Sequence, residues 1–211
     1  ITIFNPESGE TTLLAYDAVN PYSVSNSGIR DMYLDENGLM WIGLRGSGLD
    51  YLDIYSSFKY YPHIQNDPYS LSSNSLRSIY ETQDSILWIG SYNGLDRIDR
   101  KNNTLTNFTH NPSNPESISN KNVYCILEDN DNDLWIGTEG GGLNRFDRST
   151  GKFIHFIHDD NDPNSLSNQF VYVMLQDSKG FIWIGTENGL NRFDKSTGIF
   201  NRYYHDPNIN T

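Results

Sequence analysis

Cysteine is nearly absent from this chain of 211 residues, in which Cys125 is the only one. An intrachain disulfide is therefore excluded, but the compartment stays open because many periplasmic proteins also lack disulfides. Basic residues are scarce too: 15 lysines and arginines stand against 27 aspartates and glutamates, and the formal net charge is -12. Nucleic acids and anionic membranes both bind basic surfaces, so neither is expected as a partner.

Long hydrophobic runs are missing as well. No stretch approaches the roughly 18 apolar residues of a membrane-spanning helix, so no membrane segment is predicted. No basic-then-apolar leader opens the chain, and Ile1 starts in the middle of a pattern, which we interpret as a processed or excised segment. Nucleophile elbows, His-Glu-Xaa-Xaa-His helices and phosphate loops do not occur, so neither catalytic residues nor a cofactor are predicted.

Aromatic residues make up 13% of the chain, and glycine and asparagine are frequent, which favours strands and turns. Four tryptophans each open a Trp-Ile-Gly triplet, at intervals of 47, 47 and 48 residues: Trp41, Trp88, Trp135 and Trp183. A proline followed by two serines has the same period, at Pro21, Pro68, Pro115 and Pro163. Two independent markers with one period indicate an internal structural repeat.

Each repeat is predicted to form four short strands joined by three tight turns. In the third repeat these strands are 123–128, 133–138, 143–147 and 152–158. The first turn has one position filled by residues that tolerate a left-handed backbone, namely Gly38, Ser85, Asn132 and Gly180. No helical segment is expected between these four-stranded meanders.

The first two strands of each repeat are apolar on both faces, so both faces of each sheet must be covered. In the third repeat we expect Val123, Cys125 and Leu127 on one face and Ile126 on the other. Radial stacking provides such cover, with each Trp ring between two blades. The glycine after each Trp-Ile suits the close approach of the neighbouring blade.

The predicted fold is therefore all-β, a β-propeller with four complete four-stranded blades and a two-stranded half blade. The half blade is 1–17, the blades are 28–63, 75–110, 122–158 and 170–205, and all belong to one propeller domain, 1–211. A closed ring needs whole blades. We therefore expect part of a larger propeller, or open blade edges that self-associate or pair with another chain.

Two segments resemble the two-component regulator propeller repeat. One is Trp135-Ile136-Gly137-Thr138 with its continuation to Asp147, and the other is Trp183–Thr186 with Gly189–Gly198. The linker 162–168 is also similar to that family. The differences are mild and lie in one turn, at Leu44-Arg45 and at 91–93.

The resemblance implies a bacterial extracytoplasmic sensor region, and hence a periplasmic or extracellular location. In the family, such regions precede a membrane span and a histidine kinase, a hybrid kinase–regulator or a diguanylate cyclase. Several receptors of this kind in gut bacteria sense glycan fragments, and the family usually carries many more repeats than this chain.

Three sets of polar residues invite a metal or catalytic role but are better explained by structure. His63, His110, His158 and His205 share one repeat position, and equivalent positions in different blades cannot converge on one ion. The run 129–133 alternates acids like a calcium loop, but Leu134 and Gly140 replace the glycine and glutamate of an EF-hand, so we interpret it as a turn. Whether this hairpin binds calcium stays open.

The repeated acids after the third strand are expected to accept backbone N–H groups in the following turn: Asp53, Asp99, Asp147 and Asp194. A catalytic carboxylate pair would be local and asymmetric, and these acids are neither. Cys125 lies within an apolar strand and is expected to pack inertly.

Ligand-binding residues are expected where equivalent positions differ between repeats. One such position is the second residue of the first strand: Arg30, Arg77, Tyr124 and Tyr172. The other is the turn between the second and third strands: Arg45, Tyr92, Glu139 and Glu187. By analogy with other propellers, both positions are expected near the central channel, where these side chains either bind a ligand or line a solvated funnel.

Two functions compete at this stage. The first is a sensor whose propeller binds a small extracellular ligand such as an oligosaccharide, since tyrosines stack on sugar rings and charged groups bond hydroxyls. The second is an interaction or dimerisation scaffold without a small-molecule ligand. An enzyme is not predicted, because no asymmetric catalytic set is present.

Overall fold

The computed structural model describes residues 1–4, 9, 11–17, 23–35, 38–53 and 58–205. All regular secondary structure in these residues is β-strand. In the part of the chain that the structure describes, no helix is long and apolar enough to cross a membrane.

A two-stranded sheet comes first, made of β1 (Thr2–Phe4) and β2 (Thr11–Leu13). Four antiparallel sheets of four strands follow. The first blade contains β3 (Ile29–Leu34), β4 (Leu39–Leu44), β5 (Leu49–Asp53) and β6 (Phe58–Tyr61). The second contains β7 (Leu76–Glu81), β8 (Ile86–Ser91), β9 (Gly94–Asp99) and β10 (Thr104–Phe108).

The third blade contains β11 (Val123–Glu128), β12 (Leu134–Thr138), β13 (Gly142–Asp147) and β14 (Lys152–Phe156). The fourth contains β15 (Val171–Gln176), β16 (Ile182–Thr186), β17 (Gly189–Asp194) and β18 (Ile199–Tyr203). Within each blade the strands pair in sequence order. The predicted propeller of four complete blades and a two-stranded half blade is thereby confirmed.

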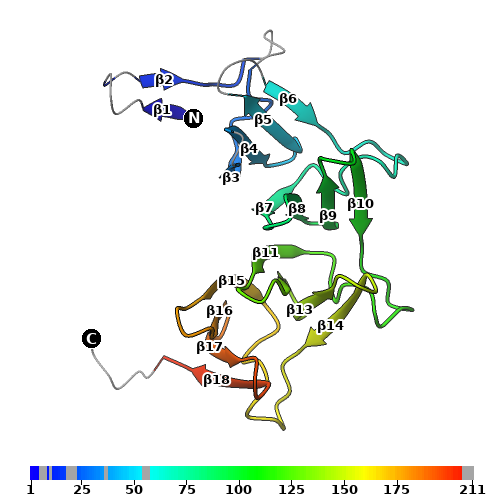
Figure 1. Cartoon of the computed structure of the whole chain (residues 1–211), viewed down its shortest axis with the longest axis vertical. Coiled ribbons are helices and arrows are strands. Elements are labelled where there is room, and N and C mark those ends of the chain that lie inside the picture. The colour runs from blue at the N-terminus through cyan, green and yellow to red at the C-terminus, as the bar shows by residue number, and fades with distance from the viewer. Residues whose placement is uncertain (5–8, 10, 18–22, 36–37, 54–57, 206–211) are drawn as a thin grey trace.

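The blades form an open arc (Figure 1), in which the first strand of every blade lies on the inner side and the fourth on the outer side. The inner strands β3, β7, β11 and β15 pack side by side. Side chains on these four strands therefore come together although they are about one repeat apart in sequence.

Turn residues close each blade as the sequence indicates. Ser85 and Asn132 have positive φ angles of 61° and 64°, and Gly38 and Gly180 occupy the same place with φ of 82° and 87°. In the third blade the Asp129 carboxylate accepts the Asp131 and Asp133 N–H groups at 2.9 and 3.0 Å. An acid at the start of the turn thus fixes its backbone.

The hydrophobic cores lie between blades rather than within them. Trp41, Trp88 and Trp135 are each 1% exposed, and each packs against the blade that follows its own. Gly137 permits this contact, because a Cβ there would lie 2.6 Å from a methyl group of Val171 on the fourth blade. The predicted place of the indoles is confirmed for these three. Trp183 is half-buried.

A β-bulge in the first strand of each blade corrects one prediction. In the third blade the register shifts between Val123 and Cys125. Val123 therefore packs with Ile126 toward the second blade, while Cys125 and Leu127 pack toward the fourth. The expectation that Val123 shares a face with Cys125 was wrong, because the extra residue of a bulge breaks the two-residue alternation.

Candidate functional site

The bulge residues are the candidate ligand-binding residues of the first strand. Register shifts fall between residues 29 and 31, 76 and 78, 123 and 125, and 171 and 173. The residue left out of the ladder is therefore Arg30, Arg77, Tyr124 or Tyr172. A bulge re-aims the side chain of its extra residue, so all four blades present a variable side chain from the same irregularity of the inner strand.

The candidate residues of the turn between the second and third strands are fixed by one repeated backbone bond. The N–H groups of Arg45, Tyr92 and Glu139 donate to carbonyls of the segment before their own first strand, at 2.7, 3.2 and 2.9 Å. Glu187 N–H does the same to Phe170 O at 2.9 Å. This bond holds each turn beside the bulge of its own blade.

Four of the eight candidate side chains form one continuous row across three blades. The Arg77 guanidinium lies between two rings, 4.2 Å from the centroid of Tyr92 and 4.4 Å from that of Tyr124. Tyr124 in turn contacts Tyr172, with ring centroids 5.2 Å apart and planes tilted by 55°. We call Tyr92, Arg77, Tyr124 and Tyr172 the tyrosine–arginine row.

Burial and two nearby glutamates affect the pKa of one tyrosine of the row, Tyr172. Burial raises the pKa of the Tyr172 hydroxyl first, and the negative charges of Glu187 and Glu139 raise it further. Glu139 also accepts a hydrogen bond from the Asn122 amide at 3.3 Å. At neutral pH Tyr172 is therefore a protonated hydroxyl that can donate a hydrogen bond.

Arg77 has unused hydrogen-bonding capacity. Its Nε is shielded from solvent and has no acceptor among the residues that the structure describes. A guanidinium held between two rings keeps its orientation, so its donors point in fixed directions. By contrast, Arg30 and Arg45 are exposed, and no described contact joins them to the row.

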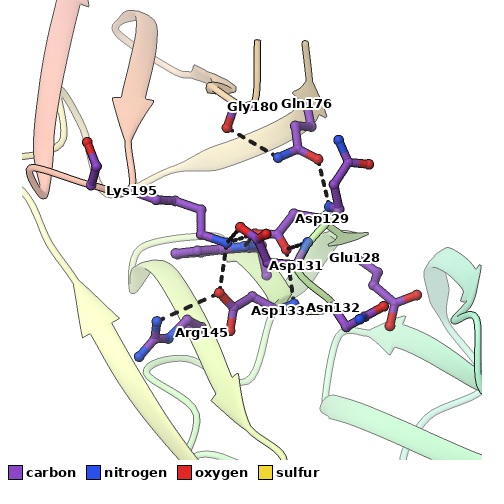
Figure 2. Close-up of polar contacts among 12 residues, drawn as sticks. Glu128, Asp129, Asp131, Asn132, Asp133, Arg145, Gln176, Gly180 and Lys195 are labelled. Atoms are coloured by element: carbon purple, nitrogen blue, oxygen red, sulfur yellow. Dashed lines mark hydrogen bonds and ion pairs between the residues drawn. The ribbon is translucent and has the colours of Figure 1, made fainter. Parts of the chain in front are cut away.

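The acidic run 129–133 is occupied by a lysine of the next blade (Figure 2). Lys195 Nζ lies 2.5 Å from Asp129 Oδ2 and 2.8 Å from carboxylate oxygens of both Asp131 and Asp133. Burial alone would lower the pKa of Lys195, but these three carboxylates raise it above its ordinary value. The ammonium group of Lys195 thus occupies the space between the three carboxylates that a bound metal cation would take. This agrees with our interpretation of residues 129–133 as a turn.

Similar cations link the other blades, and the sequence analysis missed them. Arg100 pairs with Asp35 of the preceding blade and with Glu81. Arg148 pairs with Asp84 of the preceding blade at 3.0 Å. The sequence does carry a signal for these ion pairs, because a basic residue directly follows the last acid of the third strand in each of these repeats.

Three of the four repeated histidines have the structural role that we predicted. Nδ1 of His63, His110 and His158 lies 2.6, 2.9 and 2.7 Å from a carbonyl oxygen of the following linker. These bonds tie the end of one blade to the approach of the next. The linker that follows His205 lies outside the described residues.

The repeated acids close turns. Asp147 accepts the N–H and hydroxyl of Ser149 at 2.9 and 2.7 Å, and such bonds lower its pKa to about 2. Asp194 accepts the same two bonds from Ser196, whereas Asp99 accepts the N–H and the side-chain amide of Asn102. The side chain of Asp53 lies outside the described residues. Burial raises the pKa of the Cys125 thiol to about 12, so it is not a thiolate at neutral pH.

The sequence analysis also missed a buried polar position in the third strand. It is occupied by Asp50, Asp96, Asn144 and Asn191, all 0% exposed. Each side chain accepts the N–H of a linker serine, as Asp96 does from Ser72 and Asn144 from Ser119. The repeated Ser at the end of the linker was the signal, since it needs a fixed partner in the blade.

Four segments of the chain match the model of the two-component regulator propeller repeat: residues 23–46, 70–93, 117–140 and 165–188. Each segment includes one bulge residue and one turn residue of the candidate site. A search among curated proteins finds no significant match.

Solved structures of similar fold include three bacterial surface or extracellular proteins. The extracellular domain of a proposed hybrid two component system, BT3049 from B. thetaiotaomicron, has 25% identity and a TM-score of 0.74 over 92% of this chain. The extracellular domain of BT4673, a proposed one component system from the same organism, has 17% identity and a TM-score of 0.61 over 96%. PorZ of Porphyromonas gingivalis, a surface component of the type-IX secretion system, has 19% identity and a TM-score of 0.69 over 93%.

The chain spans a minor part of each of these structures: 26% of BT3049, 34% of BT4673 and 29% of PorZ. The similarity to BT4673 and to PorZ, at 17% and 19% identity, shows only that the chain shares their propeller fold.

Proposed function

Since the chain is a two-component regulator propeller repeat protein, we propose that it belongs to the ligand-binding sensor region of a bacterial signal-transduction receptor. BT3049, whose extracellular domain has 25% identity to the chain, is described as a hybrid two component system. A periplasmic or extracellular location agrees with that relationship. Residues 1–211 then form a single propeller domain that is part of a larger propeller.

The observation that carries the proposal is the placement of Arg77 between Tyr92 and Tyr124. Side chains from the second, third and fourth blades make up the row, so a ligand there would contact all three. Such a ligand would be sensitive to any change in the angle between blades. A sensor needs this property, because a ligand shifts an equilibrium only through its different affinity for two arrangements.

The ligand class that we propose for this site is an oligosaccharide. Tyrosine rings offer flat apolar faces, while Arg77, Glu139 and the protonated Tyr172 hydroxyl can bond sugar hydroxyl groups. Few polar groups among aromatic surfaces are typical of small-molecule sites. The proposed role is binding without catalysis.

Calorimetric titration of the chain with a panel of neutral oligosaccharides tests the proposal. Arg77→Ala and Tyr124→Ala should each weaken binding about tenfold, because each removes a stacking partner from the row. Arg30→Ala is the matched control: this exposed arginine occupies the same bulge position in the first blade but lies outside the row. It should leave the affinity unchanged.

The proposal is wrong if no oligosaccharide of the panel binds, or if Arg30→Ala weakens binding as much as Arg77→Ala does. Melting temperatures of all variants should stay close to that of the unmodified chain, since the mutated side chains belong to none of the hydrophobic cores.

A further inference from the structure

The joints between blades differ in what fills them. Between the second and third blades, Phe146 packs edge-on against Trp88, with centroids 5.2 Å apart and planes at 66°. Its cross-strand partner Phe153 lies 5.1 Å from it. Between the third and fourth blades, Phe193 packs in the same way against Trp135, at 5.5 Å and 69°. Each of these joints thus contains a cross-strand pair of phenyl rings, Phe146 with Phe153 or Phe193 with Phe200, and a third ring, Phe108 or Phe156.

The joint between the first and second blades lacks this pair of rings. Its cross-strand pair at the same position is Ile98 with Leu105. Both are aliphatic and smaller than phenylalanine. The space next to them is a pocket of about 480 Å³, which is within the range of small-molecule sites.

Four aromatic residues line this pocket, Trp41, Tyr51, Tyr61 and Tyr69, together with Leu39, Arg100, Asn103 and Thr104. The ring centroids of Tyr51 and Tyr61 lie 5.1 and 6.0 Å from that of Trp41. Tyr51 is specific to this joint, because the residues opposite the other tryptophans are arginines. Tyr69 is 80% exposed. We call this space the first-joint pocket.

We propose that the first-joint pocket binds a small molecule through one aromatic ring. Trp41 is only 1% exposed, so such a ring would lie against the more exposed rings of Tyr61 and Tyr69, which are 37% and 80% exposed. Ile98 and Leu105 form an apolar floor that favours an aromatic ring over a polyhydroxylated one. Asn103 and Thr104 at the wall provide partners for one polar substituent.

This site is separate from the tyrosine–arginine row and does not depend on the proposed function. The row is built from inner strands and the turns beside them. The pocket is built from β4, β5, β6, β9, β10, the turn between β9 and β10, and the linker residue Tyr69. A ring bound here would contact both adjoining blades.

Binding of p-cresol to the full chain, followed by NMR titration, tests the inference. A ligand of this size should bind with a dissociation constant on the order of 1 mM. The double change Ile98→Phe with Leu105→Phe should abolish binding, or weaken it more than about tenfold. This variant installs the residues that the chain itself uses at the next two joints, so it should fold.

The reverse change provides the matched control. Phe146→Ile with Phe153→Leu should open a second pocket beside Trp88 and raise the number of bound p-cresol molecules from about one to about two per chain. Tyr69→Ser alters only an exposed side chain at the pocket and should weaken binding about threefold with no change in melting temperature. It keeps the test valid if either double variant fails to fold.

The inference is overturned if p-cresol does not bind at on the order of 10 mM, or if neither the filling pair nor Tyr69→Ser changes its affinity. It is also overturned if methyl glucoside binds more tightly than p-cresol and is displaced by the filling pair, since the pocket would then be a sugar site.

Discussion

The second and third blades have the same strands, the same register and an equally buried tryptophan, yet their polar interiors differ. Trp135 Nε1 donates to the Asp129 carboxylate at 2.8 Å. Trp88 Nε1 is buried and has no acceptor among the described residues, because Thr82 stands where the other blades have aspartate. Both indoles are nevertheless 1% exposed.

At the buried polar position of the third strand, the difference in charge between the two blades is reversed. The third blade has the neutral Asn144, whose amide donates to Ser119 Oγ at 2.8 Å. The second blade has Asp96, which accepts from the Ser72 N–H and from Asn107. Burial raises the pKa of Asp96 to about 6. The comparison shows that blade stacking repeats strictly, while each blade solves its buried hydrogen bonding separately.

The largest effect should come from the shared feature. Trp135→Ala removes a fully buried ring from the joint and leaves Asp129 without its indole partner, which should cost about 3–5 kcal/mol of unfolding free energy. In a chain of this size, that lowers the melting temperature by about 10 °C. Thermal unfolding followed by circular dichroism measures it.

Trp183→Ala is the matched control for that change, because Trp183 is only half-buried. It should shift the melting temperature by clearly less. Equal shifts for the two variants would mean that contact between blades does not determine the stability of the tryptophan layer.

The next effect is a pH dependence carried by Asp96. Its folded pKa of about 6 is above its ordinary value of 3.8, so the folded chain binds this proton more tightly than the unfolded chain. The stabilisation is fully present below the ordinary pKa and is lost as the pH rises through about 6. Asp96→Asn should therefore gain stability relative to the unmodified chain, by up to about 3 kcal/mol between about pH 3 and pH 7.

Asn144→Asp in the third blade is the mirror-image variant. It should lose stability over the same rise in pH, because it places a carboxylate in an equally buried position. Denaturant unfolding at a series of pH values measures both variants. Parallel pH profiles for Asp96→Asn and the unmodified chain would contradict the assignment.

The smallest effect should follow from giving Trp88 the acceptor that Trp135 has. Thr82→Asp should stabilise the second blade by about 1 kcal/mol, since a buried unpaired N–H gains a charged partner. The urea midpoint should rise slightly. The same change combined with Trp88→Phe should bring no gain, and a gain in that background would show that the indole N–H is not involved.

Much of the fold was predictable because its causes are local. The 47-residue period placed every blade, and Ser85 and Asn132 marked left-handed turns that the structure contains. The candidate residues were also placed together in part, since Arg77, Tyr92, Tyr124 and Tyr172 form one row. Arg30 and Arg45 share the pattern but not the contacts.

The bulge of the first strand could not be read from the sequence. An inserted residue leaves no compositional mark, because Arg77 and Tyr124 are both acceptable strand residues. The bulge nevertheless determines that Val123 faces the second blade. The ion pairs of Lys195 with the acidic run could not be predicted either, since Lys195 and Asp133 lie 62 positions apart in the sequence.

The sequence by itself determined the repeat, the four strands of each blade and the turns that join them, because apolar alternation and turn residues act over a few neighbouring positions. Only the tertiary structure decided which side chains meet between blades. Those contacts depend on how one sheet stacks on the next, and therefore on the sizes of the side chains at each joint. A cross-strand pair of phenylalanines helps to fill one joint, while isoleucine and leucine at the same positions leave a pocket in another.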